Sequence, residues 1–161
     1  MLDLKKLIDG SVDSVSFFAT IDACDLADDV IEGNVHASGE IVNHSGFITL
    51  SGVVKPDFKA TCARCGKEFL YKTPFNINAK LTDKLANEDE DEFVIIEDNL
   101  LDVEELVRSE AVLELPSRFL CKDKCKGLCP KCGCDLNVAT CSCDVKDHDP
   151  RWDALKNYFE D

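Results

Sequence analysis

Residues 121–143 read CKDKCKGLCPKCGCDLNVATCSC and hold seven of the ten cysteines in this 161-residue chain. A separate CxxC motif, Cys62-Ala63-Arg64-Cys65, lies far upstream, and Cys24 stands alone. Cysteines clustered this closely form disulfides, bind a metal ion, bind an iron–sulfur cluster or carry out redox chemistry. The choice among these four uses determines what the rest of the chain can be.

The N-terminal segment guides that choice. Residues 1–9, MLDLKKLID, carry acidic side chains where a signal peptide would be apolar. No apolar run in the chain approaches the roughly 20 residues of a transmembrane helix. We therefore expect a cytoplasmic protein. Structural disulfides are rare in that compartment, and clustered cysteines there favour metal binding or catalysis.

The spacing of the cysteines predicts two metal sites. Two cysteines separated by two residues can bind one tetrahedral ion, because the turn between them brings both sulfur atoms together. In both CxxC pairs a glycine follows, which permits a left-handed turn. The first expected site joins the upstream motif to the start of the cluster, and the second is a local knuckle: Cys62, Cys65, Cys121 and Cys125 for the first, and Cys129, Cys132, Cys141 and Cys143 for the second. We expect Zn²⁺ at both sites, so two ions per chain.

The assignment of some ligands stays open, and so does an iron–sulfur cluster as the alternative to zinc. Cys134 is left over by this partition and competes with Cys132 or Cys141, and His148 is a substitute ligand. Residues 125–132 have the CxxxCxxC spacing of radical iron–sulfur enzymes, but too few residues follow to build their barrel. A non-radical iron–sulfur cluster remains the alternative, because spacing alone does not identify the metal. Redox catalysis is disfavoured, since the upstream motif is expected in a hairpin rather than at a helix N-terminus.

Alternating apolar and polar residues predict a β-rich first half. The expected strands cover residues 15–21, 30–43, 47–54, 57–61, 68–81 and 93–96, which places the upstream CxxC motif at a turn between two of them. Asp102-Val103-Glu104-Glu105 has the form of a capping box, and the apolar positions that follow predict a helix to about Leu115, ended by Pro116. A second helix is expected after Asp149-Pro150.

These elements predict an α+β fold, with a mainly antiparallel β-sheet or partial barrel, one long helix and a cysteine-rich zinc-binding C-terminal segment. Residues 1–116 are the expected β-rich domain, which includes the CxxC hairpin and the helix. Residues 117–161 are the expected metal-binding tail, whose terminal helix packs on the same domain. The acidic run at residues 87–92 is expected to be a solvated loop.

The charge balance limits the partners. The chain has 18 basic and 32 acidic side chains and a formal net charge of −14. Such a surface repels phosphate backbones and suits a basic protein partner. The tail departs from this balance, because basic side chains surround its cysteines and are candidates for contact with RNA or with a partner protein: Arg118, Lys122, Lys124, Lys126 and Lys131.

Catalytic signatures are missing from the sequence. It contains no Ser/His/Asp set, no glycine-rich phosphate loop and no HExxH motif. A closed site of four cysteines also leaves no open coordination position for a substrate. We therefore expect a protein that is not an enzyme, and a nucleic-acid-binding zinc module that uses the basic tail stays open as an alternative.

Several short motifs occur together in this chain: Leu113-Glu114-Leu115-Pro116, the cysteine run from Cys121 to Gly133, Asp135-Leu136-Asn137, Cys141-Ser142-Cys143, Asp149-Pro150-Arg151 and the upstream CxxC motif. In this order they resemble the YceD family, the bacterial large ribosomal RNA subunit accumulation proteins. The resemblance covers nearly the whole chain. It implies a role in ribosome biogenesis, in the accumulation of large-subunit (23S) ribosomal RNA.

The resemblance also implies partners and a ligand set. Genes of such families often neighbour the gene of ribosomal protein L32, a small basic protein, so the implied partners are a basic ribosomal protein such as L32, the ribosomal RNA, or both. Relatives with a shortened tail support a first site of Cys62, Cys65, Cys121 and Cys125, and a second, dispensable knuckle at residues 129–143. This chain departs from the pattern at Cys134, where a residue other than cysteine is expected.

Overall fold

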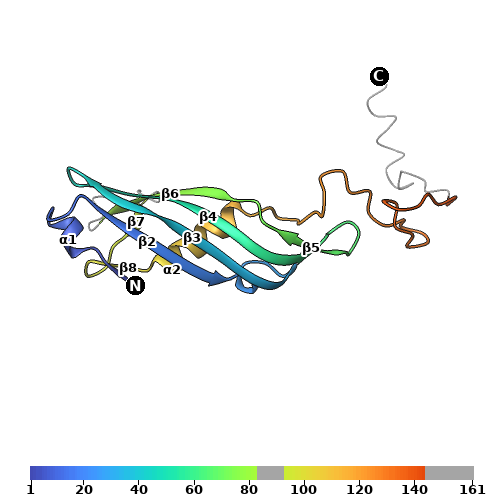
Figure 1. Ribbon diagram of the computed structural model, residues 1–161, viewed down its shortest axis with the longest axis horizontal. Helices are drawn as coiled ribbons and strands as arrows, with labels where there is room; N and C mark the ends of the chain where they lie inside the picture. The colour runs from blue at the N-terminus through green and yellow to red at the C-terminus, as the bar shows by residue number, and fades with distance from the viewer. Residues whose placement is uncertain (83–92, 144–161) are drawn as a thin grey trace, which may run out of the picture. The chain divides into compact units, whose positions relative to one another are not determined.

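The computed structural model describes residues 1–82 and 93–143 (Figure 1). The expectations for the acidic run, for His148 and for the terminal helix fall outside the described residues. The chain divides into two compact units: the first unit comprises Met1–Ala63 and Lys67–Cys121, and the second unit comprises Arg64–Gly66 and Lys122–Asp161. None of the helices in the described ranges is both long and apolar enough to span a membrane.

The first unit is built on a six-stranded sheet. Its strands are β2 (Ser14–Asp22), β3 (Val30–His44), β4 (Phe47–Thr61), β5 (Glu68–Tyr71), β6 (Phe75–Thr82) and β7 (Phe93–Ile95). Their order is β2-β3-β4-β6-β7, with β5 paired to β4 off this path, and only the β6–β7 pairing is parallel. The prediction of a mainly antiparallel sheet is confirmed. The partial barrel stays a prediction, because this strand order describes an open path.

The central strand β4 explains two differences from the predicted strands. The sequence predicts separate strands before and after Pro56, yet β4 runs through this residue. On one side of β4, pairing with β6 ends at Val54 and pairing with β5 begins at Phe58, so Pro56 falls in a gap where a missing N–H is tolerated. The strand expected at residues 68–81 likewise divides into β5 and β6, which Pro74 separates.

Helix α2 (Val103–Glu114) begins and ends where the sequence predicts. The Asp102 carboxylate accepts a hydrogen bond from the Glu105 N–H at 3.1 Å, and Leu115 caps the other end before Pro116. The helix has 12 residues, which is an ordinary length, so its predicted extent is right but its description as a long helix is not confirmed. Pro116 follows the C-terminal cap, as expected, because proline cannot continue a helix.

The core lies on one face of the sheet. Helix α2 crosses this face against β2 (Figure 1) and buries the side chains that recur at helical spacing: Val103, Leu106, Val107 and Ala111. The apolar pattern of the sequence does not predict the short elements: α1 (Lys5–Ile8), η1 (Ala23–Asp25) and the paired strands β1 (Leu2–Asp3) and β8 (Leu100–Leu101). Through Leu4 and Leu7, both fully buried, the N-terminal segment adds to the same core.

An aromatic cluster fixes the segment that follows α2. The buried Phe119 ring lies edge-on to Phe58 at 5.5 Å and to Tyr71 at 5.2 Å between ring centroids. The Phe119 carbonyl also accepts a hydrogen bond from the Ala63 N–H at 2.9 Å. These contacts place the chain that leads to Cys121 beside the turn that follows β4.

Candidate metal centres

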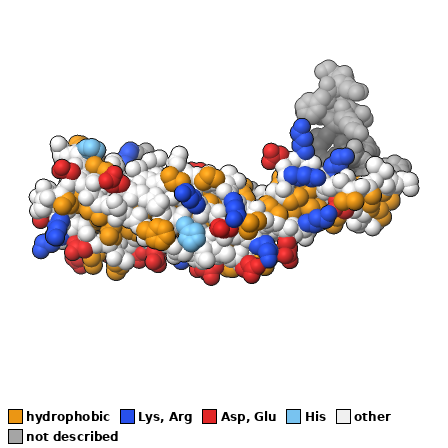
Figure 2. Space-filling model, in the orientation of Figure 1, with side chains coloured by type: hydrophobic (Ala, Val, Ile, Leu, Met, Phe, Trp, Pro, Cys, Tyr) orange, Lys and Arg blue, Asp and Glu red, His pale blue; other side chains and the backbone are white. Residues whose placement is uncertain are grey.

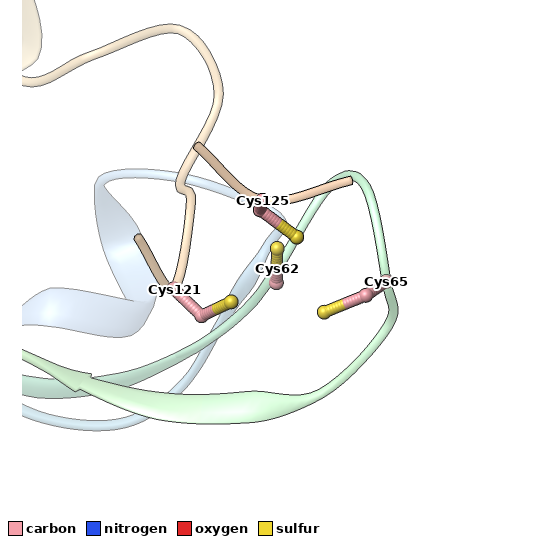
Figure 3. A group of neighbouring side chains, drawn as sticks. All are labelled: Cys62, Cys65, Cys121 and Cys125. Carbon is pink, nitrogen blue, oxygen red and sulfur yellow. The ribbon is translucent and has the colours of Figure 1, made fainter. Parts of the chain in front are cut away.

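The first candidate centre is the upstream CxxC motif together with the start of the cysteine cluster. The sulfur atoms of Cys62, Cys65, Cys121 and Cys125 all lie within 4.8 Å of one another. Figure 3 shows the four thiols converging on a common point. A tetrahedral ion with Zn–S distances of about 2.3 Å places its sulfur ligands roughly 3.8 Å apart. The arrangement therefore fits a metal ion held by four cysteines.

The turn after β4 presents the first two of these cysteines. The Cys62 N–H donates to the Lys67 carbonyl at 2.9 Å, which closes the turn between β4 and β5. Gly66 has a φ of +67°, in the left-handed region that favours glycine. The upstream motif thus lies in a hairpin, as the sequence predicts, and not at a helix N-terminus.

A set of contacts within the second unit holds Cys125. The Arg64 guanidinium donates to the Cys125 carbonyl at 2.9 Å, and the Arg64 carbonyl accepts from the Leu128 N–H at 3.1 Å. Gly127 has a φ of +74°, and a β-carbon there would lie 2.9 Å from the Arg64 carbonyl oxygen. Arg64, inside the CxxC motif, therefore fixes the backbone around a cysteine that is 61 positions away.

Asn137 is a further residue of this site that the sequence analysis does not single out as functional. Its side-chain amide donates to the Cys125 sulfur at 3.4 Å, and its carbonyl oxygen accepts from the Lys126 N–H at 2.9 Å. The Asp135 carboxylate in turn accepts from the Asn137 side chain at 2.8 Å. Hydrogen bonds of this kind orient a ligand and stabilise its thiolate. The Asp135-Leu136-Asn137 motif is the only signal in the sequence that could have pointed to this role.

The second candidate centre is the local knuckle. The sulfur atoms of Cys129, Cys132, Cys141 and Cys143 also lie within 4.8 Å of one another. The Gly133 N–H donates to the Cys129 carbonyl at 2.9 Å, and Gly133 has a φ of +72°. The glycine thus closes the turn that brings the two sulfur atoms of the CxxC pair to one point.

The backbone of the knuckle lowers the pKa of one thiol, that of Cys129. Backbone N–H groups of Cys132 and Lys131 point at the Cys129 sulfur and lower the pKa of its thiol to about 6. A hydrogen bond with Cys132 raises the pKa of the Cys143 thiol to about 12. Since the thiolate is the form that binds metal, Cys129 is the ligand that this backbone favours most.

The remaining candidates are placed as follows. Cys132, and not Cys134, belongs to the knuckle group. The Cys134 carbonyl accepts a hydrogen bond from the Cys129 N–H at 2.8 Å. Cys24 is exposed in η1. Arg118 belongs to the first unit, whereas Lys122, Lys124, Lys126 and Lys131 belong to the second, and all five are exposed. Figure 2 shows Lys and Arg side chains gathered on the drawn face of the cysteine-rich segment.

Comparison with known proteins bears on both centres. The model of the family described as "Large ribosomal RNA subunit accumulation protein YceD" matches residues 50–158, a range that contains all eight cysteines of the two centres. A chloroplastic YCED homolog 1 of Arabidopsis thaliana, named as a large ribosomal RNA subunit accumulation protein, is 26% identical over 156 residues, which cover 78% of this chain and 49% of that protein.

An uncharacterized protein of Mycobacterium tuberculosis is 30% identical over 116 residues, which cover 67% of this chain and 54% of that protein. An uncharacterized protein of Mycobacterium bovis matches to the same extent. The chain thus spans about half the length of the curated relatives it matches. No solved structure matches it significantly. Because the family model covers more than half of the chain, including every cysteine that the fold gathers into a candidate metal centre, the chain belongs to the YceD family of large ribosomal RNA subunit accumulation proteins.

Proposed function

We propose that this protein is a non-enzymatic ribosome-biogenesis factor that supports the accumulation of large-subunit (23S) ribosomal RNA. The observation that carries the proposal is the family match over residues 50–158. The Arabidopsis relative is likewise named as a large ribosomal RNA subunit accumulation protein. Two groups of four cysteines agree with a structural use of metal. Four cysteine ligands fill a tetrahedral coordination sphere and leave no position open for a substrate.

Both centres hold Zn²⁺ in this proposal. Four thiolates with tetrahedral spacing are a common structural zinc site, and the ion contributes folding free energy directly, on the order of 10 kcal/mol per site. An iron–sulfur cluster also takes four cysteines. Elemental analysis and an absorption spectrum of the purified protein separate the two: zinc gives a colourless protein, and a brown protein that contains iron would contradict the proposal.

The protein acts through a basic ribosomal protein, such as L32, which it shields until that protein meets ribosomal RNA. This part of the proposal is supported by the net charge of −14, which attracts cationic proteins and repels the phosphate backbone. A pull-down with the tagged protein should recover a basic ribosomal protein at low salt and lose it at high salt. Recovery that does not change with salt would contradict the electrostatic basis of the partnership.

The test of the function itself is depletion of the protein in its own cells. The ratio of 23S to 16S ribosomal RNA should fall on depletion and recover when the wild-type chain is supplied again. An unchanged ratio would contradict the proposed function, whatever the protein binds in a purified system.

A nucleic-acid-binding zinc module is the second candidate. It is favoured by the local charge of the second unit, whose described residues include five basic side chains and two acidic ones. Reversing the charges of Lys124, Lys126 and Lys131 should abolish binding of 23S ribosomal RNA if this candidate is right. If the protein acts through a basic partner instead, the same variant should keep its ability to restore the 23S level.

A further inference from the structure

We infer that the groove between residues 26–29 and the C-terminal end of α2 receives a basic segment of the partner protein that carries an apolar side chain. This inference rests on the proposed function, because it assigns a surface to the basic partner named there. All residues that line the groove belong to the first unit.

The groove is a hollow of about 330 Å³. Leu26 and Ala27 line it on one side, and Val112, Leu115 and Pro116 line it on the other. A volume of this size accommodates a few side chains of a peptide rather than a whole domain. The lining combines these apolar side chains with Asp28, Asp29 and Ser117, so it suits a short segment that carries both charge and one apolar side chain.

The walls of the groove are held in place before any ligand binds. The Arg108 guanidinium of α2 donates to the Asp25 carboxylate at 2.9 Å, which joins the helix to η1. The Val30 N–H donates to the Ala27 carbonyl at 3.1 Å, and the Thr61 N–H donates to the Asp29 carbonyl at 2.9 Å. A site whose backbone is already fixed loses less conformational entropy when it binds a partner.

Helix α2 exposes apolar side chains at this end. Val112 is 52% exposed and its neighbour Leu113 is 79% exposed, although the same helix buries four other apolar residues in the core. Exposed apolar side chains that gather beside a groove indicate an interaction site, especially where polar residues form the rim. The anchor of the partner would cover Val112 and Leu115.

The charge around the groove selects the partner. Residues 97–118 contain seven acidic side chains and two basic ones, Arg108 and Arg118, and residues 22–32 contain five acidic side chains and none that is basic. Asp28 and Asp29 lie at the groove itself. This field repels RNA phosphates, and it also repels a second copy of the same surface. A cationic protein segment is the occupant that fits.

The control surface is the other face of the sheet, which also has a hollow. Ser38, Glu40, Ser51, Val53 and Asn76 are among the residues that line it. Val53 is 38% exposed, so it provides an apolar side chain comparable with Val112, and the exposed Glu40 provides a comparable carboxylate. Substitutions there change apolarity and charge without touching the groove.

The test uses the full zinc-loaded chain and two labelled synthetic peptides, a lysine-rich peptide with one leucine and the same peptide with glycine in place of the leucine. We expect Val112→Ser to weaken binding of the leucine peptide about tenfold, which corresponds to about 1.4 kcal/mol, and to leave the glycine peptide unchanged. The double change Asp28→Asn and Asp29→Asn should weaken both peptides and reduce the salt dependence of binding. Val53→Ser and Glu40→Gln should change neither affinity.

Three results would overturn the inference. The first is equal binding of the two peptides to the wild-type chain. The second is a loss of affinity with Val53→Ser as large as that with Val112→Ser. The third is a change in self-association with Val112→Ser, measured by sedimentation without peptide, since this would identify the groove as an interface between two copies.

A cellular test separates this inference from the proposed function. If depletion lowers 23S ribosomal RNA and both the Val112→Ser chain and the Asp28→Asn, Asp29→Asn chain restore it fully, the groove inference fails while the function stands. If depletion leaves 23S unchanged, the function fails, and the peptide measurements still decide whether the groove binds basic segments. Restoration by Val53→Ser but not by Val112→Ser supports both.

Discussion

The two units of this protein are stabilised by different means. The first unit buries leucine, isoleucine, valine and phenylalanine side chains between its sheet and α2. In the described part of the second unit, the buried residues are Cys65, Cys125, Gly127 and Cys129, while Leu128 and Val138 are exposed. Among these described residues, apolar burial is too small to offset the entropy of ordering the chain. We therefore expect the fold of the second unit to depend on the proposed metal ions more strongly than the fold of the first unit.

Removal of the metal should cause the largest difference in stability between the two units. A zinc chelator should abolish amide protection in residues 122–143, because each site contributes on the order of 10 kcal/mol. The strands of the first unit should keep their protection, apart from the turn at Cys62. Hydrogen exchange with and without chelator measures this, and equal protection of residues 122–143 in both samples would contradict the comparison.

Loss of one ligand should have the next largest effect. Cys132→Ser should remove one of the two proposed zinc ions per chain, because three cysteines bind a structural ion weakly. The matched control is Cys134→Ser, two positions away, which should keep both ions since Cys134 lies outside both groups. Elemental analysis of both variants measures the zinc content. Zinc loss in Cys134→Ser with retention in Cys132→Ser would show that the two cysteines exchange roles.

A change in the apolar core should affect the first unit instead. Phe119→Ala removes a buried ring from its contacts with Phe58 and Tyr71 and should cost about 3–5 kcal/mol. Leu113→Ala, at a position that is 79% exposed, should change stability by less than about 0.5 kcal/mol. Urea unfolding followed by far-ultraviolet circular dichroism compares the two variants. Equal midpoints would mean that the aromatic cluster does not stabilise this unit.

The smallest expected effect concerns a residue that supports a ligand. Asn137→Ala removes the hydrogen bond to the Cys125 sulfur and should lower metal affinity about 10- to 100-fold, without loss of the metal at saturation. Asn78→Ala, on the exposed face of the sheet, is the control and should leave the affinity unchanged. Competition with a chromophoric chelator measures both. An unchanged affinity in Asn137→Ala would remove this residue from the site.

The sequence predicts the two units unequally well. Enrichment in β-branched and aromatic residues locates β2 closely, alternation of apolar and polar residues locates β3, and Asp102 and Pro116 give the ends of α2. Short elements escape such reasoning because tertiary contacts define them: the Leu4 N–H, for example, donates to the Asn99 carbonyl at 2.8 Å, nearly a hundred residues away. The continuity of β4 through Pro56 is missed for the same reason, since only the pairing of neighbouring strands shows that a missing N–H is tolerated there.

For the metal centres, local spacing is enough to group the knuckle cysteines. The grouping of Cys62 and Cys65 with Cys121 and Cys125 depends on counting which cysteines remain, because no local pattern links segments so far apart. The Asp135-Leu136-Asn137 motif draws attention to Asn137 but not to its role, and nothing in the sequence assigns a role to Arg64. Their roles depend on backbone geometry around Cys125 that exists only in the folded chain.

The gap beside β4 also bears on how the protein stays free of aggregates. Within the described residues, the stretch Lys55-Pro56-Asp57 has β3 on one side and no strand on the other, so it is a short open edge in the middle of the sheet. An open edge invites a strand from another molecule. Proline offers such a strand no N–H, and the flanking charges oppose its approach. Pro56 thus helps to keep this sheet from pairing with a strand of another molecule.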